Sequence, residues 1–325
     1  MKTKYLFMLP LVAFLMAACD YSEDELQPSG ETTSYTLPQG SHSYDQKIVD
    51  FYNNYGTQLI YKFEYKDAYW TPTGWQNGDS SEENGKVGFV IQYPDENYVG
   101  QQVDLLHEVW FDELSNKAKK ELLPGVILLC GEVDYLSSTW DFSSWPAKQV
   151  YSPSNVYAYC NYANMCVGYA NSSITSITDA EKKAYSKALK HAWAEFIADR
   201  FVGPTSDFAF VVDYSKVSSL YYIKECCAAG ITTVGYSASA LADWKNFLYM
   251  MMCYPEGWLT EDPGIIGDWD SFGNSYDPHE DTDFHGILNV AKDSNGLIKQ
   301  RYDIVRQYFI DNYDIDIQTL GNNLE

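Results

Sequence analysis

The segment from Asp179 to Phe201 is the strongest helix signal in the sequence, and it most limits what the chain can fold into. Thr178 and Glu181 have the spacing of a capping box at its start, and Gly203-Pro204 follows its end. Small side chains along the segment allow another element to approach closely: Ala184, Ala188, Ala192, Ala194 and Ala198. We expect this segment to be the central helix of the fold.

The other periodic segments are of mixed type. A second helix is predicted from Leu297 to Asn312, with an apolar stripe made by Ile298, Tyr302, Val305 and Phe309. A shorter helix is predicted over Asp45–Tyr52, with Ile48, Val49 and Tyr52 on one side. The run Gln58–Tyr65 is typical of a strand, and residues 124–136 contain a buried apolar run of strand length. Helices and strands without a regular alternation favour an α+β fold.

The N-terminus has the pattern of a secretory signal. Two lysines precede an apolar run from Tyr5 to Ala18, which is too short to span a bilayer as a helix. The residues up to Cys19 read Leu-Met-Ala-Ala-Cys, which resembles a lipobox, whereas a chance cysteine after an ordinary signal is the alternative. We therefore expect a signal peptide over 1–18 and lipid attachment at Cys19, which would make the lipid anchor the contact with the membrane.

The residues after Cys19 predict where the chain is held. The acidic cluster Asp20–Glu25 resembles an export tag for the outer face of the outer membrane, although it also suits a solvated tether. Residues 19–43 are polar and acidic and predict a flexible tether, and residues 44–325 predict a single domain. The expected location is the outer membrane at the cell surface.

Charge and composition limit the classes of molecule that the protein is expected to bind. The chain carries 45 acidic and 22 basic residues, a net charge of −23, which argues against nucleic acid as a partner. Its 28 Tyr, 15 Phe and 9 Trp either fill the core or stack on sugar rings, and Trp70 and Trp75 in a polar loop are candidate glycan contacts. The six cysteines besides Cys19 form no CxxC pair, although Cys160 and Cys166 are close enough to bridge a short loop.

The central helix carries a partial metal motif. On a helix, positions four apart lie on one face, so His191 and Glu195 could point at one ion. A zinc peptidase helix needs HExxH there, with two histidine ligands and a glutamate that deprotonates the bound water. Here the glutamate position holds Ala192 and the second histidine position holds Glu195.

From Tyr44 to Leu320 the chain resembles the zinc-binding metallopeptidase family of bacterial surface lipoproteins, which are encoded beside outer-membrane glycan-uptake systems. The resemblance rests on the central helix and on four further segments, which read YDQKIVDFYNNYGTQLIYKFEYKD, DFAFVVDYS, GYSASALADWKNFLYM and QRYDIVRQYFIDNYDIDIQTL. It implies a zincin-like fold. It also implies a third zinc ligand from a motif Glu-Asp-Phe-Ala-Glu, which here reads Ala-Asp-Trp-Lys-Asn over 242–246 and retains Asp243.

These departures predict a degenerate site. A catalytic zinc needs three protein ligands and an open position, and loss of the general base alone costs about 10²–10⁴ in rate. We therefore expect no cofactor and a non-catalytic pseudopeptidase that binds a glycan or a protein partner. The alternative is a zinc hydrolase whose rearranged site uses His191, Glu195 and Asp243. A third option is an accessory subunit that docks on an outer-membrane transporter.

Two further patterns are weaker. His107-Glu108 has Phe111 where a second ligand would stand, so it predicts an amphipathic segment and no metal site. The acidic stretch 255–285 contains Asp268, Asp270, Asn274 and Asp277, which could form a loose calcium site or a solvated loop. His279 and His285 lie in the same stretch and could bind a transition metal weakly.

Overall fold

The computed structural model describes residues 35–71, 74–75, 87–220, 223–232, 238–264 and 284–325. The expected signal peptide, Cys19, the cluster Asp20–Glu25 and the acidic loop 268–277 lie outside the described residues. Residues 37–325 form one compact unit. This unit includes residues 37–43, expected above to belong to the tether, and the Gln39 side chain bonds the backbone of Tyr61 and Lys62.

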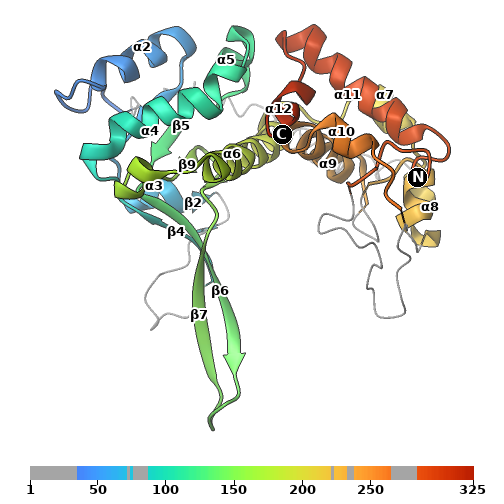
Figure 1. Cartoon of the computed structure of the whole chain (residues 1–325), viewed down its shortest axis with the longest axis horizontal. Coiled ribbons are helices and arrows are strands. Elements are labelled where there is room, and N and C mark those ends of the chain that lie inside the picture. Colours follow the sequence, from blue (N-terminus) through green and yellow to red (C-terminus); the bar gives the residue numbers. More distant parts are fainter. Residues whose placement is uncertain (1–34, 72–73, 76–86, 221–222, 233–237, 265–283) are drawn as a thin grey trace, which may run out of the picture. The chain divides into compact units, whose positions relative to one another are not determined.

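Helices and strands are mixed, as expected for an α+β fold (Figure 1). The helices are α2 (Asp45–Tyr55), α3 (Tyr65–Tyr69), α4 (Glu96–Val109), α5 (Asn116–Leu122), α6 (Asp179–Arg200), α7 (Ser206–Phe210), α8 (Ile223–Ala228), α9 (Ala240–Cys253), α10 (Glu256–Thr260), α11 (Leu297–Tyr313) and α12 (Gln318–Asn322). The strands are β1 (Gln58–Ile60), β2 (Trp70–Thr71), β3 (Gly74–Trp75), β4 (Gly88–Gln92), β5 (Val126–Leu129), β6 (Glu132–Asp141), β7 (Lys148–Asn155), β8 (Ala158–Cys160) and β9 (Met165–Val167).

The strands form two larger sheets and one short pair. In the first sheet the order is β1-β5-β9-β8, in which β1, β5 and β9 are parallel and β8 is antiparallel to β9. The second sheet is antiparallel with the order β4-β6-β7. Strand β4 pairs with β6 only as far as Leu136, whereas β6 and β7 stay paired to Asp141 and Lys148. Among the described residues, β6 and β7 therefore continue beyond Leu136 as a two-stranded ribbon (Figure 1).

Three sequence expectations need correction. The apolar run 124–136 is two strands in different sheets, because the chain turns at Gly131, where a Cβ atom would lie 2.6 Å from the Tyr93 carbonyl oxygen. The run Gln58–Tyr65 is a strand only over β1. Helix α2 buries Ile48 and Phe51, whereas Tyr52 is exposed, so its buried stripe runs through Phe51 in place of Tyr52.

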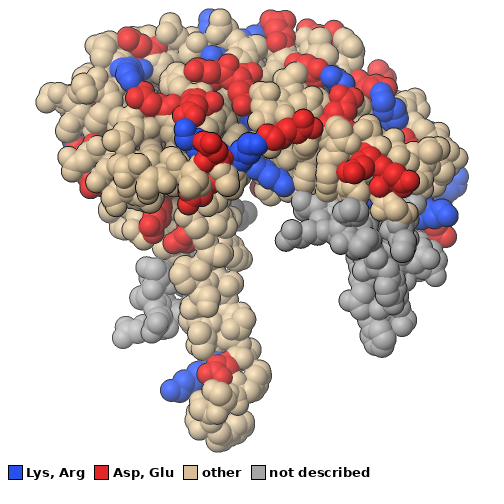
Figure 2. Space-filling view, in the orientation of Figure 1, with Lys and Arg blue, Asp and Glu red and all other residues tan. Residues whose placement is uncertain are grey.

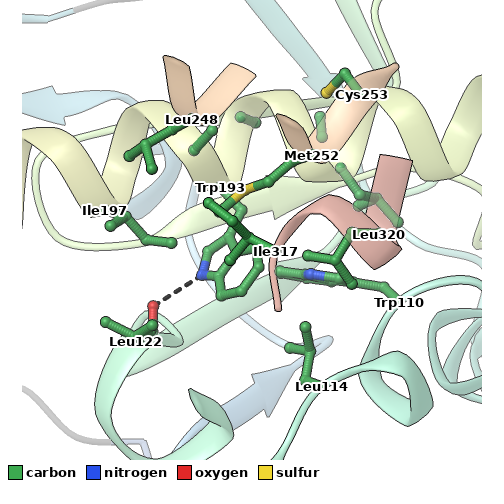
Figure 3. Packing of buried hydrophobic residues seen from close by; sticks show 14 of the residues in the cluster. Trp110, Leu114, Leu122, Trp193, Ile197, Leu248, Met252, Cys253, Ile317 and Leu320 are labelled. Atoms are coloured by element: carbon green, nitrogen blue, oxygen red, sulfur yellow. Dashed lines mark hydrogen bonds between the residues drawn. The ribbon is translucent and has the colours of Figure 1, made fainter. Parts of the chain in front are cut away.

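The predicted central helix is present as α6 and ends within one residue of the expected position. Its capping box is formed: the Glu181 amide donates to Thr178 Oγ1 (3.2 Å) and the Thr178 amide donates to the Glu181 carboxylate (2.7 Å). The helix buries Trp193 completely, and the indole Nε1 donates to the Leu122 carbonyl oxygen at 2.8 Å (Figure 3). Around this indole lie side chains from several elements, among them Ile197, Leu248, Met252, Ile317 and Leu320 (Figure 3).

Helices α6 and α9 run antiparallel along each other. The Lys245 ammonium lies 2.7 Å from the Asp199 carboxylate near one end, and the Cys253 thiol donates to the Lys187 carbonyl oxygen near the other. Helix α12 is held on α6 by the buried Lys190, whose Nζ donates to the Leu320 carbonyl oxygen (2.8 Å). Desolvation lowers the pKa of Lys190, and the nearby Glu113 opposes this shift.

Two further expectations, about the α11 stripe and about Cys160 and Cys166, have different outcomes. The predicted stripe on α11 is fully buried, with Ile298, Tyr302, Val305 and Phe309 all in the core. All six described cysteines are free thiols, so Cys160 and Cys166 do not bridge a loop. In the described part of the chain, no helix combines the length and the hydropathy that a membrane span requires.

Candidate functional site

His191 and Glu195, at the zinc-peptidase positions of α6, have no third His, Cys, Asp or Glu ligand close to them among the described residues. His191 Nε2 and Glu195 Oε1 are 3.9 Å apart, and about half of each side chain is exposed. The His191 ring packs on the Tyr249 ring of α9, with ring centroids 4.2 Å apart. Desolvation lowers the pKa of His191 below its ordinary value, Glu195 opposes this shift and Lys187 adds to it. The histidine thus contacts α9 through the Tyr249 ring, whereas its charged neighbours Glu195 and Lys187 lie on its own helix.

The general-base position faces the protein interior. Ala192 is only 6% exposed and belongs to the main hydrophobic core. The Cys160 thiol of β8 donates to the Ala192 carbonyl oxygen at 3.1 Å. A carboxylate at this position would have to displace core contacts before it could reach a water molecule outside. The packing of α6 on the sheet thus leaves room for the small Ala192 side chain at the general-base position.

Asp243, the retained residue of the third-ligand motif, is fully buried and takes part in a hydrogen-bond network. Its Oδ2 lies 2.7 Å from Arg301 Nη1 and accepts from the Tyr214 hydroxyl at 2.6 Å. Its Oδ1 accepts from the amide (3.0 Å) and the hydroxyl (2.8 Å) of Thr232. Both carboxylate oxygens thus accept hydrogen bonds from three other residues, Tyr214, Thr232 and Arg301.

Arg301 is the partner that holds this carboxylate. It comes from α11, is fully buried, and also donates to the Gly230 carbonyl oxygen and the Tyr214 hydroxyl. The guanidinium lies 3.8 Å from the Phe208 ring centroid, so an aromatic face completes its surroundings. A buried carboxylate that is neutralised by an arginine has little left to offer a cation.

The three candidate zinc-site positions are therefore not brought together. His191 and Glu195 lie on the half-exposed face of α6, whereas Asp243 is enclosed around Arg301. Across the described ranges, no three His, Cys, Asp or Glu side chains are close enough to hold a metal ion. The described residues therefore do not supply the three convergent protein ligands that a catalytic zinc needs.

The other histidines of interest have structural surroundings. His107 lies on the amphipathic α4, as expected, and its Nδ1 is 2.9 Å from Asp112. His285 is buried against the Trp258 ring, and its Nε2 is 3.1 Å from Glu261. His279 and the four expected calcium ligands, Asp268, Asp270, Asn274 and Asp277, lie outside the described residues. The backbones of Trp70 and Trp75 pair across β2 and β3, but their side chains are outside the described part.

A polar hollow lies between the start of α2 and α4, with a volume of about 460 Å³. We call it the His42 hollow; it is lined by His42, Ser43, Tyr44, Lys47, Glu96, Asn97, Gly100, Gln101 and Asp104. His42 stacks on Tyr44 with the ring planes 7° apart, and His42 Nε2 lies 2.9 Å from Glu96 Oε2. Sequence reasoning missed this hollow because its two walls are about fifty residues apart and carry no recognisable motif.

Comparison with known proteins leaves the family of the chain undefined. No protein-family model matches it, and neither does any curated protein. The chain is similar to a crystal structure described as "a putative zinc-binding metallo-peptidase from Bacteroides caccae ATCC 43185". The two chains are 13% identical, and the match covers 88% of this chain and 92% of that chain with a TM-score of 0.43. A likeness at this level does not define a family or an activity.

Proposed function

We propose that this protein is a non-catalytic surface lipoprotein, a zincin-like pseudopeptidase that binds a glycan or a protein partner near an outer-membrane uptake system. The observation that carries the proposal is the ion pair between Asp243 and Arg301, which occupies the one acidic residue retained from the third-ligand motif. The buried Ala192 at the general-base position supports it further. In this proposal lipidation of Cys19 holds the body at the cell surface, where it could also dock on a transporter.

Zinc retention is the first prediction. The chain beginning at residue 21, equilibrated with zinc and freed of excess metal, should retain no more zinc than its His191→Ala variant, because the three candidate ligands do not converge. Elemental analysis measures this directly. His107→Ala is the matched control, since His107 is also a partly exposed histidine beside a carboxylate. Stoichiometric zinc that is lost only in His191→Ala would overturn the proposal and favour the zinc hydrolase.

The His42 hollow is the site we propose for a glycan. Its volume lies within the usual range of small-molecule sites, and its lining combines amides, carboxylates and a lysine, which can bond sugar hydroxyls from several directions. Asn97 and Gln101 lie one turn apart on α4, so both amides face the same space. The ring of His42 is stacked on Tyr44 and about 43% of its side chain is exposed, which leaves a flat face for a pyranose ring.

Glycan binding is the second prediction. Neutral oligosaccharides titrated by calorimetry should bind the chain, and Gln101→Ala should weaken the affinity about fivefold to tenfold, the worth of one lost hydrogen bond. Gln307→Ala is the control, because Gln307 is an exposed glutamine on α11 whose amide bonds Asp311. If Trp75→Ala lowered the affinity for the oligosaccharide and Gln101→Ala did not, the glycan site would be assigned to β2 and β3. If no oligosaccharide bound, the glycan-binding proposal would be refuted, and a protein partner would be the remaining proposal.

A further inference from the structure

The end of the β6–β7 ribbon presents large aromatic side chains to solvent. Trp145 is 94% exposed, Phe142 is 78% exposed and Trp140 is 59% exposed. These three lie within six residues of one another in the sequence, at and next to the turn that joins the two strands. Trp193, Trp110 and Trp244 are by contrast fully buried. Several large exposed aromatic side chains within one short segment are typical of an interaction site.

The ribbon is electrically neutral although the protein is strongly acidic. From Tyr135 to Asn155 the only charged residues are Asp141 and Lys148, which are directly opposite each other in the strand register. In the space-filling view the ribbon is almost free of charge, whereas acidic side chains cover much of the body above it (Figure 2). A neutral aromatic tip on a protein of net charge −23 avoids the repulsion that the body would feel at an anionic surface.

The tip is also held away from the rest of the second sheet. Five further register pairs separate Leu136, where β4 ends its pairing, from Asp141. At about 3.4 Å per residue this ribbon is about 17 Å long, which is roughly twice the Debye length at physiological ionic strength. Charges near the base of the ribbon are therefore largely screened from a surface that the tip touches.

We propose that the tip formed by Trp140, Phe142 and Trp145 inserts into the interface of a lipid membrane and orients the body on it. Tryptophan favours this interface because its ring is apolar and its N–H remains hydrogen-bonded. The end of the ribbon protrudes from the body (Figure 2). The His42 hollow is polar and charged, and therefore does not suit the tip of a second copy. A fluid lipid surface needs no preformed pocket and matches an apolar, uncharged, protruding tip.

Vesicle partitioning tests this inference. The chain beginning at residue 21 retains the whole described core, which contains no residue before Leu37. It should co-sediment with vesicles of zwitterionic phosphatidylcholine, equally at low and high salt because the tip is neutral. The double variant Phe142→Ser/Trp145→Ser should lower the partition coefficient at least about tenfold, since each buried aromatic contributes a factor of that order. Phe210→Ser is the matched control, because Phe210 is 85% exposed on α7 and should leave partitioning unchanged.

A second variant keeps all three aromatic residues. Ser144→Cys, labelled with an environment-sensitive dye, should shift its emission to the blue when vesicles are added, and the unsubstituted chain treated in the same way corrects for dye on native cysteines. The inference is overturned if the wild-type chain does not bind vesicles, or if the double variant partitions into vesicles as strongly as the wild type. It is also overturned if high salt abolishes vesicle binding. If the wild type bound no vesicles and the double variant lost binding of a glycan or a protein ligand, the tip would be assigned to that ligand. This result would also overturn the membrane inference.

Discussion

Arg301→Met is expected to lower the free energy of unfolding by about 3–5 kcal/mol, the usual cost of removing one partner from a buried ion pair. The substitution leaves the Asp243 carboxylate fully buried without its counter-charge. The donors on Thr232 and Tyr214 remain but carry no positive charge. The loss is therefore mainly the desolvation penalty of an uncompensated anion. Urea unfolding followed by circular dichroism measures the change.

Two further variants show whether the charge is the cause. Adding Asp243→Asn to Arg301→Met should recover a large part of the loss, because the amide keeps hydrogen bonds and removes the buried charge. Lys299→Met removes an exposed pair with Asp303 on the same helix and should change stability by about 0.5 kcal/mol or less. If Arg301→Met lowered the free energy of unfolding by less than about 1 kcal/mol, well below the range for a buried pair, the Asp243–Arg301 ion pair would not be a main stabilising contact of the core. Asp243 would then remain a candidate metal ligand.

Trp193→Ala is the second large effect, with an expected loss of about 3–5 kcal/mol in the free energy of unfolding. The indole is fully buried where α6 packs on α9 and α12, and its N–H satisfies the Leu122 carbonyl oxygen (Figure 3). The variant leaves a cavity the size of an indole and an unpaired buried carbonyl group. Thermal and urea unfolding should both report it.

The matched control for this prediction is Trp145→Ala at the ribbon tip. It removes the same side chain from a position that is 94% exposed, so the free energy of unfolding should change by about 0.5 kcal/mol or less. Trp193→Phe should give an intermediate loss, because a ring still fills most of the space. Equal effects at the two tryptophans would contradict the assignment of Trp193 to the core and of Trp145 to solvent.

Local signals predicted three of the described helices, which are α2, α6 and α11. The capping box at Thr178 and Glu181 and the apolar stripe on α11 are encoded within a few consecutive residues, and both are present in the structure. Strands were harder to predict. The sequence of the apolar run 124–136 does not show that it forms two strands, β5 and β6. The turn between them becomes apparent only from the close approach of Gly131 to the Tyr93 carbonyl oxygen.

The candidate site was only partly predictable. The motif comparison identified His191, Ala192 and Glu195 as neighbours, because helical periodicity alone sets their spacing. It could not say that Ala192 faces the core or that Tyr249 covers His191, since both depend on which elements α6 meets. The His42 hollow carried no sequence signal at all.

Short-range information in the chain thus decides where helices begin, end and turn their apolar faces, because hydrogen bonds and side-chain periodicity act over one or two turns. The tertiary structure alone decides the long-range pairings. Asp243 meets Arg301 across 58 residues. Among the described residues β4 pairs with β6 only as far as Leu136, so the β6–β7 ribbon carries its exposed aromatic side chains beyond the three-stranded part of the sheet. Burial sets the consequences of these pairings, because the same carboxylate is a potential ligand when open to solvent and a structural anion when enclosed with an arginine.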